Sequence, residues 1–130
     1  MTLDNNSFIG QIRVARFKYF NHTKNKLDFK SRPILIIGVE RDTGPCDFTI
    51  LPISSILRQE NIIPYYDIKL DKVIYPGLNL QSDCYCRSSK VSTVHSGEVS
   101  AKLISSVSLA YPDLYNTIQE RFNSFTSELF

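Results

Sequence analysis

The chain has 130 residues, of which 42% are hydrophobic and 22% are charged, and its formal net charge is +2. These values are ordinary for a soluble globular protein and predict a single domain over residues 1–130, long enough to bury a sizeable core. No apolar run approaches the length that spans a bilayer, and Asp4, Asn5 and Asn6 argue against a signal peptide. We therefore expect a cytoplasmic protein that makes no contact with a membrane.

The cysteines and histidines give no sign of a disulfide framework or a metal site. The chain has three cysteines, and an odd number with Cys84 and Cys86 only two positions apart is a poor basis for disulfides. These two cysteines also lack the second ligand pair that a zinc site needs, and His22 and His95 are isolated from each other. We expect neither a metal nor a cofactor.

Positive charge is concentrated near the start of the chain. Residues 1–32 contain seven basic residues against two acidic ones, a local excess of five, while the remaining residues are slightly acidic. A charge excess confined to one strand and its loop can attract a polyanion, and the alternative is an ordinary solvated surface.

In chain order, residues 1–8 are expected to form a frayed terminus and residues 10–19 the first strand. The apolar positions of this strand change parity near Ala15, which predicts a bulge there. Residues 21–31 are polar and basic without periodicity, which predicts a loop of about ten residues, long enough to be functional.

The next strand begins at an Arg-Pro pair and carries a short aliphatic run, residues 34–37, closed by Gly38. Such a run suits a strand buried on both faces. Pro33 has no N–H to donate, so it is expected at the first position of the strand, with Arg32 at the strand mouth. An arginine held there can fork onto a phosphate, or it can simply cap the strand.

The rest of the chain predicts short strands separated by turns, followed by one helix. The expected strands are residues 48–51 (ended by Pro52), 65–70, 84–86, 91–94 and 101–104; the turns are residues 40–45 and 76–77, and residues 53–59 are expected to form a short helical turn. Residues 112–129 predict the helix, because Leu114, Ile118, Phe122, Phe125 and Leu129 recur at helical spacing. The fold class is therefore mostly β with α (α+β), with a strongly bent or barrel-like antiparallel sheet covered by the terminal helix.

Two motifs in this arrangement resemble those of a known family. Arg32-Pro33 with its aliphatic strand is the first, and the segment from Arg87 to Val94, with its Arg-x-x-x-Val-x-Thr-Val pattern, is the second. Together with the closing helix, they resemble the MazF/PemK/Kid toxins, the ribonucleases of bacterial type II toxin–antitoxin pairs, over roughly residues 8–129. The resemblance implies a small SH3-like antiparallel barrel with a long C-terminal helix, usually assembled as a homodimer.

The resemblance also implies an activity, a partner and site residues. The activity is metal-independent cleavage of single-stranded RNA at short sequence motifs, and the partner is a cognate antitoxin protein. The family's arginine before proline falls on Arg32, its hydroxyl residue at the end of the third strand falls on Ser54, and its second arginine falls on Arg87. Ser55 takes the place of Ser54 if the register slips by one.

The expected chemistry uses the 2′-OH of the RNA as nucleophile on the adjacent phosphate. The protein must help to remove that proton, stabilise charge on the phosphoryl oxygens and protonate the leaving 5′-oxygen. Arg32 would contact the phosphate and assist proton transfer, and Ser54 would donate a hydrogen bond to a phosphoryl oxygen or orient the 2′-OH. Arg87 would hold a neighbouring phosphate or share the charge stabilisation. Arginine is a poor general base because its pKa is so high, so the electrostatic role of Arg32 is the better supported one.

Some positions depart from the family pattern. Ser89 stands where some members have an acidic residue, so the general base is not assigned. Further residues expected to contact RNA are Lys24, Lys26, Lys30, Ser55, Ser89, Lys90 and His22. Tyr65 and Tyr66 could stack on unpaired bases or serve only in packing. Two other functions stay open: a catalytically weak relative that binds nucleic acid or protein, and a plain SH3-like interaction domain.

Overall fold

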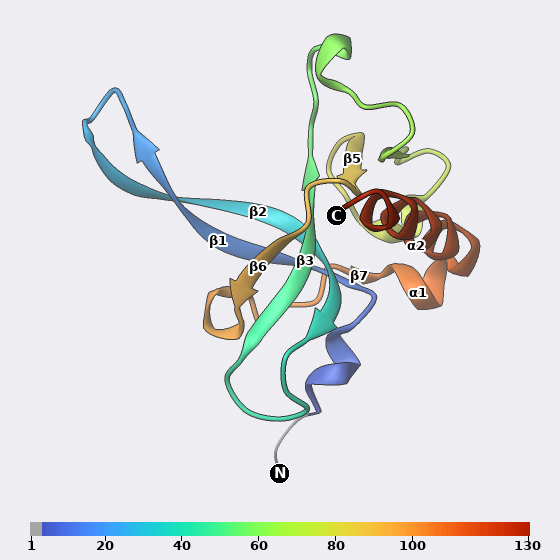
Figure 1. Ribbon diagram of the computed structural model, residues 1–130, viewed down its shortest axis with the longest axis horizontal. Coiled ribbons are helices and arrows are strands. Elements are labelled where there is room, and N and C mark those ends of the chain that lie inside the picture. Colours follow the sequence, from blue (N-terminus) through green and yellow to red (C-terminus); the bar gives the residue numbers. More distant parts are fainter. Residues whose placement is uncertain (1–3) are drawn as a thin grey trace.

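The computed structural model describes residues 4–130, which form seven strands, two α-helices and four short 3₁₀ helices (Figure 1). The strands are β1 (Gln11–Asn21), β2 (Lys26–Val39), β3 (Asp47–Ser54), β4 (Asp67–Leu70), β5 (Cys84–Arg87), β6 (Ser92–His95) and β7 (Ser105–Ser106). The α-helices are α1 (Val107–Ala110) and α2 (Pro112–Ser127), and the 3₁₀ helices are η1 (Asn5–Phe8), η2 (Gln59–Asn61), η3 (Pro76–Leu78) and η4 (Ser96–Glu98). The predicted α+β class, mostly β with a C-terminal helix, is confirmed.

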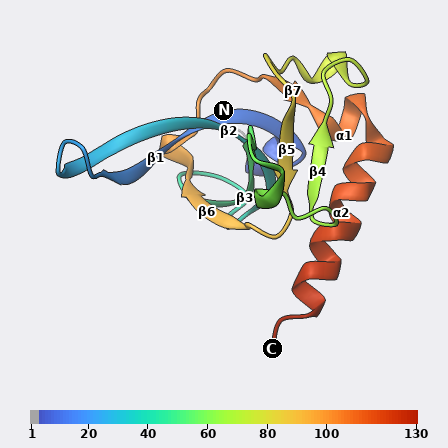
Figure 2. The same ribbon diagram turned by 90° about the horizontal axis from the view of Figure 1, so that it is seen from above.

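The sheet is antiparallel and strongly curled. Its strand order is β4-β5-β3-β2-β1-β7, with β6 beside β3. β3 changes partner along its length, since Asp47 to Ile50 pair with β6 whereas Ile53 and Ser54 pair with β5. This change of partner bends the sheet into a half-barrel with β2 and β3 at its centre (Figures 1 and 2).

The aliphatic run of β2 is buried on both faces of the sheet, as its composition predicts. Leu35 joins a cluster under α2 that includes Leu114 and Ile118, whereas Ile34 and Ile36 join another cluster on the opposite side of the strand. Each of the three β2 residues is at most 1% exposed. Because burying such a side chain stabilises a fold by roughly 1.5–3 kcal/mol, this run fixes β2 firmly in the centre of the molecule.

α2 lies against the sheet through the predicted apolar stripe. Leu114 and Ile118 are buried and Phe122 packs against the same core. The helix begins at Pro112, whose missing N–H costs nothing at a first helical position. Its C-terminal end runs outward from the sheet (Figure 2), and Leu129, beyond the helix end, is 46% exposed. The stripe therefore contacts the core through its N-terminal members.

The tyrosine pair before β4 packs against α2. The rings of Tyr66 and Phe125 meet edge to face at 5.6 Å, and the guanidinium of Arg121 lies 4.4 Å above the Tyr65 ring and donates to the Tyr65 carbonyl at 2.9 Å. The Tyr65 hydroxyl also hydrogen-bonds with Ser124 on α2, and the Tyr66 hydroxyl donates to the carboxylate of Glu128, which directly follows the helix. Of the two roles considered for these tyrosines, packing is the one that the structure supports.

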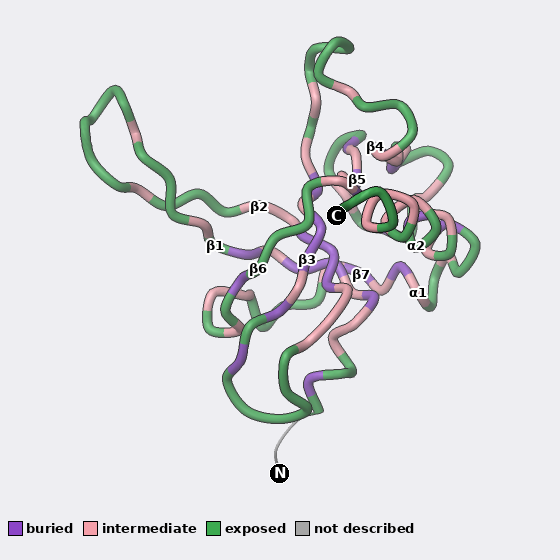
Figure 3. Tube along the Cα trace, in the orientation of Figure 1, coloured by how far each residue is buried: buried purple, intermediate pink, exposed green. Residues whose placement is uncertain are grey.

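The expected loop over residues 21–31 is wrong, because β1 and β2 continue into it as a long hairpin arm. They pair without interruption from Ile12↔Leu35 to Asn21↔Lys26, so only residues 22–25 form the turn, and there is no bulge near Ala15. The arm projects away from the rest of the molecule and is largely exposed (Figures 1 and 3). A two-stranded ribbon with solvent on both faces needs no polar–apolar alternation, and this is why the sequence pattern failed there.

Both prolines that were expected to bound strands lie inside them. Pro33 pairs with Val14 within β2, and Pro52 pairs with Ile34 within β3. Pro33 lies just beyond the last residue of β2 that pairs with β3, so its missing N–H removes no bond to that strand. The register between β2 and β3 shifts between Ile36 and Gly38, away from both prolines.

Three smaller expectations are corrected. Residues 5–8 form η1, capped by the Asp4 carboxylate, and are not frayed; residues 1–3 lie outside the described part of the chain. Residues 53–59 contain the end of β3 instead of a helical turn, which appears later as η2. The last strand is β7, with α1 directly after it, instead of residues 101–104. These segments are too short to carry a periodic signal.

Candidate active site

A cleft of about 690 Å³ opens beside the end of β3. Five of the residues that the sequence singles out line it: Arg32, Ser54, Ser55, Arg87 and Lys90. They come from β2, β3, β5 and the adjoining loops, so the fold brings together residues that are far apart in the chain.

The strand register explains why Arg32 and Ser54 meet. β2 and β3 pair as far as Ile34↔Pro52, and continuing this antiparallel register by two positions sets Arg32 across from Ser54. The strands part before that point, because Ser54 pairs with Tyr85 on β5. The cleft therefore opens where β3 leaves β2, with the half-buried side chains of Arg32 and Ser54 on its two sides.

Arg87 is held in place by a buried carboxylate. Its Nε lies 3.1 Å from Asp67 Oδ1 and its Nη2 lies 3.2 Å from Asp67 Oδ2, a bidentate pair, and Nη2 also donates to the Asn61 carbonyl at 3.1 Å. The Asp67 side chain is fully buried and also accepts the backbone N–H of Ile63 at 2.8 Å. Because Asp67 balances its charge, Arg87 acts first as an anchor that shapes the cleft wall from Asn61 to Ile63.

The connection between β3 and β4 supplies polar residues that the sequence analysis missed. Arg58, Glu60 and Asn61 all line the cleft, and Glu60 supplies a carboxylate to it. The charge of Arg87 is balanced by Asp67. The remaining charged residues of the cleft are three basic ones and one acidic one, namely Arg32, Arg58, Lys90 and Glu60. The cleft therefore has an excess of positive charge, which favours binding of a phosphate backbone. The only signal in the sequence was the polar composition of this connection.

The other predicted RNA contacts lie outside this cleft. Lys24, Lys26 and His22 belong to the tip of the hairpin arm, where the His22 ring packs on Phe20 at 4.9 Å. Lys30 lines a smaller hollow that shares Arg32 with the cleft. The role of these residues in RNA binding stays a prediction.

Ser89 follows Arg87 by two positions but does not line the cleft. Its Oγ is buried and has no hydrogen-bond partner within residues 4–130. A buried hydroxyl in this position cannot stand in for the carboxylate that some members of the resembled family carry. Glu60 is the cleft residue that could.

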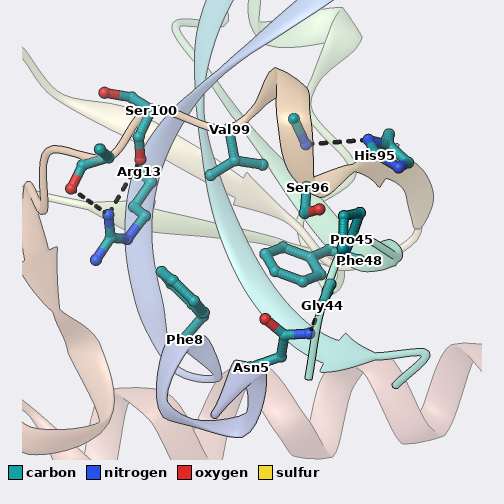
Figure 4. Close-up of a pocket in the computed structure, with 12 residues that line it drawn as sticks. Asn5, Phe8, Arg13, Gly44, Pro45, Phe48, His95, Ser96, Val99 and Ser100 are labelled. Atoms are coloured by element: carbon teal, nitrogen blue, oxygen red, sulfur yellow. Dashed lines mark hydrogen bonds between the residues drawn. The ribbon is translucent and has the colours of Figure 1, made fainter. Parts of the chain in front are cut away.

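Another pocket, of about 660 Å³, is lined by the apolar side chains of Phe8, Phe48 and Val99 and by the buried Arg13 (Figure 4). Arg13 Nη1 donates to the carbonyls of Ser100 at 3.0 Å and Ala101 at 2.6 Å, and its guanidinium stacks 4.6 Å from the Phe8 ring. Burial lowers the pKa of Arg13. These contacts join the segment before β7 to β1, which indicates a structural role.

The cysteines and acidic residues form neither a reactive thiol site nor a metal site within residues 4–130. All three cysteines are free and buried, and burial raises the pKa of Cys86 to about 12, so its thiol stays protonated at neutral pH. Residues 4–130 contain no cluster of His, Cys, Asp and Glu suited to a metal ion. Within the same range, no helix has the length and apolarity needed to cross a bilayer.

A scan against protein-family models and a search of curated proteins each found no match to this chain.

Proposed function

We propose that the protein is a metal-independent, sequence-selective endoribonuclease toxin of a type II toxin–antitoxin system, with an SH3-like barrel of the MazF/PemK/Kid type. One observation carries this: Arg32, Ser54 and Arg87, chosen from the sequence, line one cationic cleft. The three residues are far apart in the chain, and their meeting in one cleft is what supports the proposal.

In the proposed reaction, the 2′-oxygen of the RNA attacks the adjacent phosphorus. A bond forms between O2′ and phosphorus, the bond from phosphorus to O5′ breaks, and the leaving O5′ takes a proton from water, so that the products are a 2′,3′-cyclic phosphate and a 5′-hydroxyl. Arg32 stabilises the charge that builds on the phosphoryl oxygens, and Ser54 donates a hydrogen bond to one of them. Arg87, tied to Asp67, holds the part of the cleft wall that contains Asn61.

Glu60 is the proposed base that removes the 2′-OH proton, because it is the carboxylate among the residues that line the cleft. We expect Glu60→Gln to lower the cleavage rate by about 100-fold or more, within the range typical of general base catalysis. It should also flatten the acidic side of the pH–rate profile, which distinguishes a lost base from a lost contact. The control is Glu120→Gln on α2, outside the cleft; equal rates for both variants would remove Glu60 from this role.

The experiment that tests the function is incubation of the purified protein with a long single-stranded RNA in EDTA, followed by mapping of the cuts. We expect cuts at a recurrent short motif, and about 10- to 100-fold slower cutting by Ser54→Ala, since a hydrogen bond to a charged group contributes about 1.5–3 kcal/mol. RNA that stays intact but shifts on a gel would favour the catalytically weak binding protein. The buried Ser89 hydroxyl, in place of an acid, is the observation that favours this second function.

A cognate antitoxin and a homodimer belong to the same proposal. An acidic antitoxin segment would complement the cationic cleft and block access of RNA. Light scattering, which gives the molar mass in solution, tests the dimer. The antitoxin is tested by asking whether the small acidic protein encoded by a neighbouring gene competes with RNA for binding to this protein.

A further inference from the structure

A small hollow of about 220 Å³ lies where the hairpin arm leaves the sheet. Its walls and floor combine aromatic, basic and apolar side chains, namely Phe17, Tyr19, Lys30, Arg32, Ile50 and Pro52. At ~30 Å³ per molecule, this volume corresponds to about seven waters, which is room for one flat ring system and too little for an oligomer.

The strand register sets these side chains on one face of the arm. Phe17 lies across from Lys30 and Tyr19 across from Asp28, and alternate residues of a strand share a face. Phe20 and its neighbours in register therefore point to the other face. The face that leads into the hollow thus presents an aromatic ring beside a lysine.

The Tyr19 ring is available for a ligand, unlike the aromatic rings on the other face. It is 41% exposed and, within residues 4–130, forms none of the ring–ring or cation–ring contacts found elsewhere in the protein. By contrast, the Phe20 ring meets His22 at 4.9 Å, and the Phe29 ring carries the Arg16 guanidinium at 4.2 Å. An exposed ring without a partner is suited to stacking on an unpaired base.

Arg32 connects the hollow to the cleft, since it lines both. An RNA strand whose phosphate contacts Arg32 in the cleft can therefore place its neighbouring nucleotide in the hollow. The Ser92 hydroxyl at the rim donates to the Lys90 carbonyl at 3.1 Å, which leaves its oxygen free to accept from a base edge.

We propose that this hollow binds the unpaired nucleobase next to the phosphate held by Arg32, with Tyr19 as its stacking platform; the identity of the ligand as RNA rests on the ribonuclease function proposed above. Lys30 and Ser92 face the edge of the base and give the subsite its preference among bases. Tyr19 is thus a base-binding residue, separate from the groups that act on the phosphate and from the Lys30 and Ser92 groups that read the base edge.

The test is binding of 2′-O-methyl RNA heptamers, which cannot be cleaved, each with one 2-aminopurine flanked by adenine, cytosine or uracil. We expect the wild type to quench 2-aminopurine fluorescence, and Tyr19→Ala to abolish the quenching and raise Kd about 10-fold, within the range of base–aromatic stacking. Tyr19→Phe should retain both. Phe20→Ala is the matched control, because its side chain is similarly exposed (45%) but lies on the opposite face of the arm.

The possible outcomes separate this subsite from the proposed enzyme. Equal effects of Tyr19→Ala and Phe20→Ala, or an absence of quenching by the wild type, overturn the subsite even if RNA is cleaved. Quenching that depends on Tyr19 in a protein that cuts no RNA supports the subsite and overturns the ribonuclease. Thermal melts of the variants show whether a loss of binding reflects unfolding. If Tyr19→Ala unfolds, Tyr19→Leu replaces it, since leucine keeps an apolar side chain but offers no ring for stacking; wild-type quenching by Tyr19→Leu would overturn the subsite.

Discussion

Replacing Arg32 with alanine is expected to lower the rate of RNA cleavage by about 100- to 1,000-fold, the usual cost of removing a donor that stabilises developing charge. The Arg32 side chain lines the cleft and makes none of the side-chain hydrogen bonds or ion pairs found within residues 4–130, so its loss leaves no buried group unpaired. The measurement is the initial rate of cleavage of a defined single-stranded RNA, with a thermal melt of each variant. The melting temperature should change little.

The control for Arg32→Ala is Arg41→Ala, which removes an exposed arginine from the turn between β2 and β3. Its net charge change is the same, and Arg41 does not line the cleft. If both variants slow cleavage equally, the effect comes from general charge attraction, and Arg32 has no special place in the reaction. If Arg32→Ala cuts RNA at the wild-type rate, the proposed site is wrong.

Replacing Arg87 with alanine is expected to lower the free energy of unfolding by about 3 kcal/mol, because it leaves the fully buried Asp67 carboxylate without its partner. The Arg87 side chain keeps 21% exposure, which places the cost at the lower end of the range for buried pairs. The melting temperature should fall on the order of 10 °C. Urea unfolding with a common m value for both proteins measures the change.

The control for this pair is Lys69→Ala, which breaks the exposed Lys69–Asp71 contact at 4.0 Å and should hardly change stability. The double variant Arg87→Met/Asp67→Leu should recover part of the loss, since no charge stays buried. Stability unchanged by Arg87→Ala, together with lost cleavage, would show that Arg87 acts on the RNA and does not anchor the cleft wall.

The parts of the fold that the sequence predicts are those with a strong local pattern. The aliphatic run of β2 and the apolar stripe of α2 each specify one element, because burial of those side chains dominates every alternative. The outer part of the hairpin arm, residues 20–31, was missed, because Phe20, Leu27 and Phe29 are exposed and follow no burial pattern. Pro33 and Pro52 misled the strand bounds, since a proline is tolerated wherever its strand needs no N–H bond at that position.

The residues of the candidate site also divide into those that a local sequence pattern predicts and those that it does not. Arg32, Ser54 and Arg87 were found through motifs on strands, and strands have fixed places in the sheet. Arg58 and Glu60 were missed, because their place depends on the ion pair between Arg87 and Asp67, a contact between distant segments that no local pattern encodes. Ser89 could not be judged from its position in the motif, because only the fold shows that its hydroxyl is buried.

The most direct test of the central claim is cleavage, in EDTA, of a short single-stranded RNA and of the same oligomer with a single 2′-deoxy nucleotide before the mapped cut. We expect the RNA to be cut to a 2′,3′-cyclic phosphate and a 5′-hydroxyl, and the substituted oligomer to resist at that position only, with both results lost in Arg32→Ala. Cutting of the substituted oligomer at the same bond, or products that carry a 5′-phosphate, would contradict attack by the 2′-oxygen.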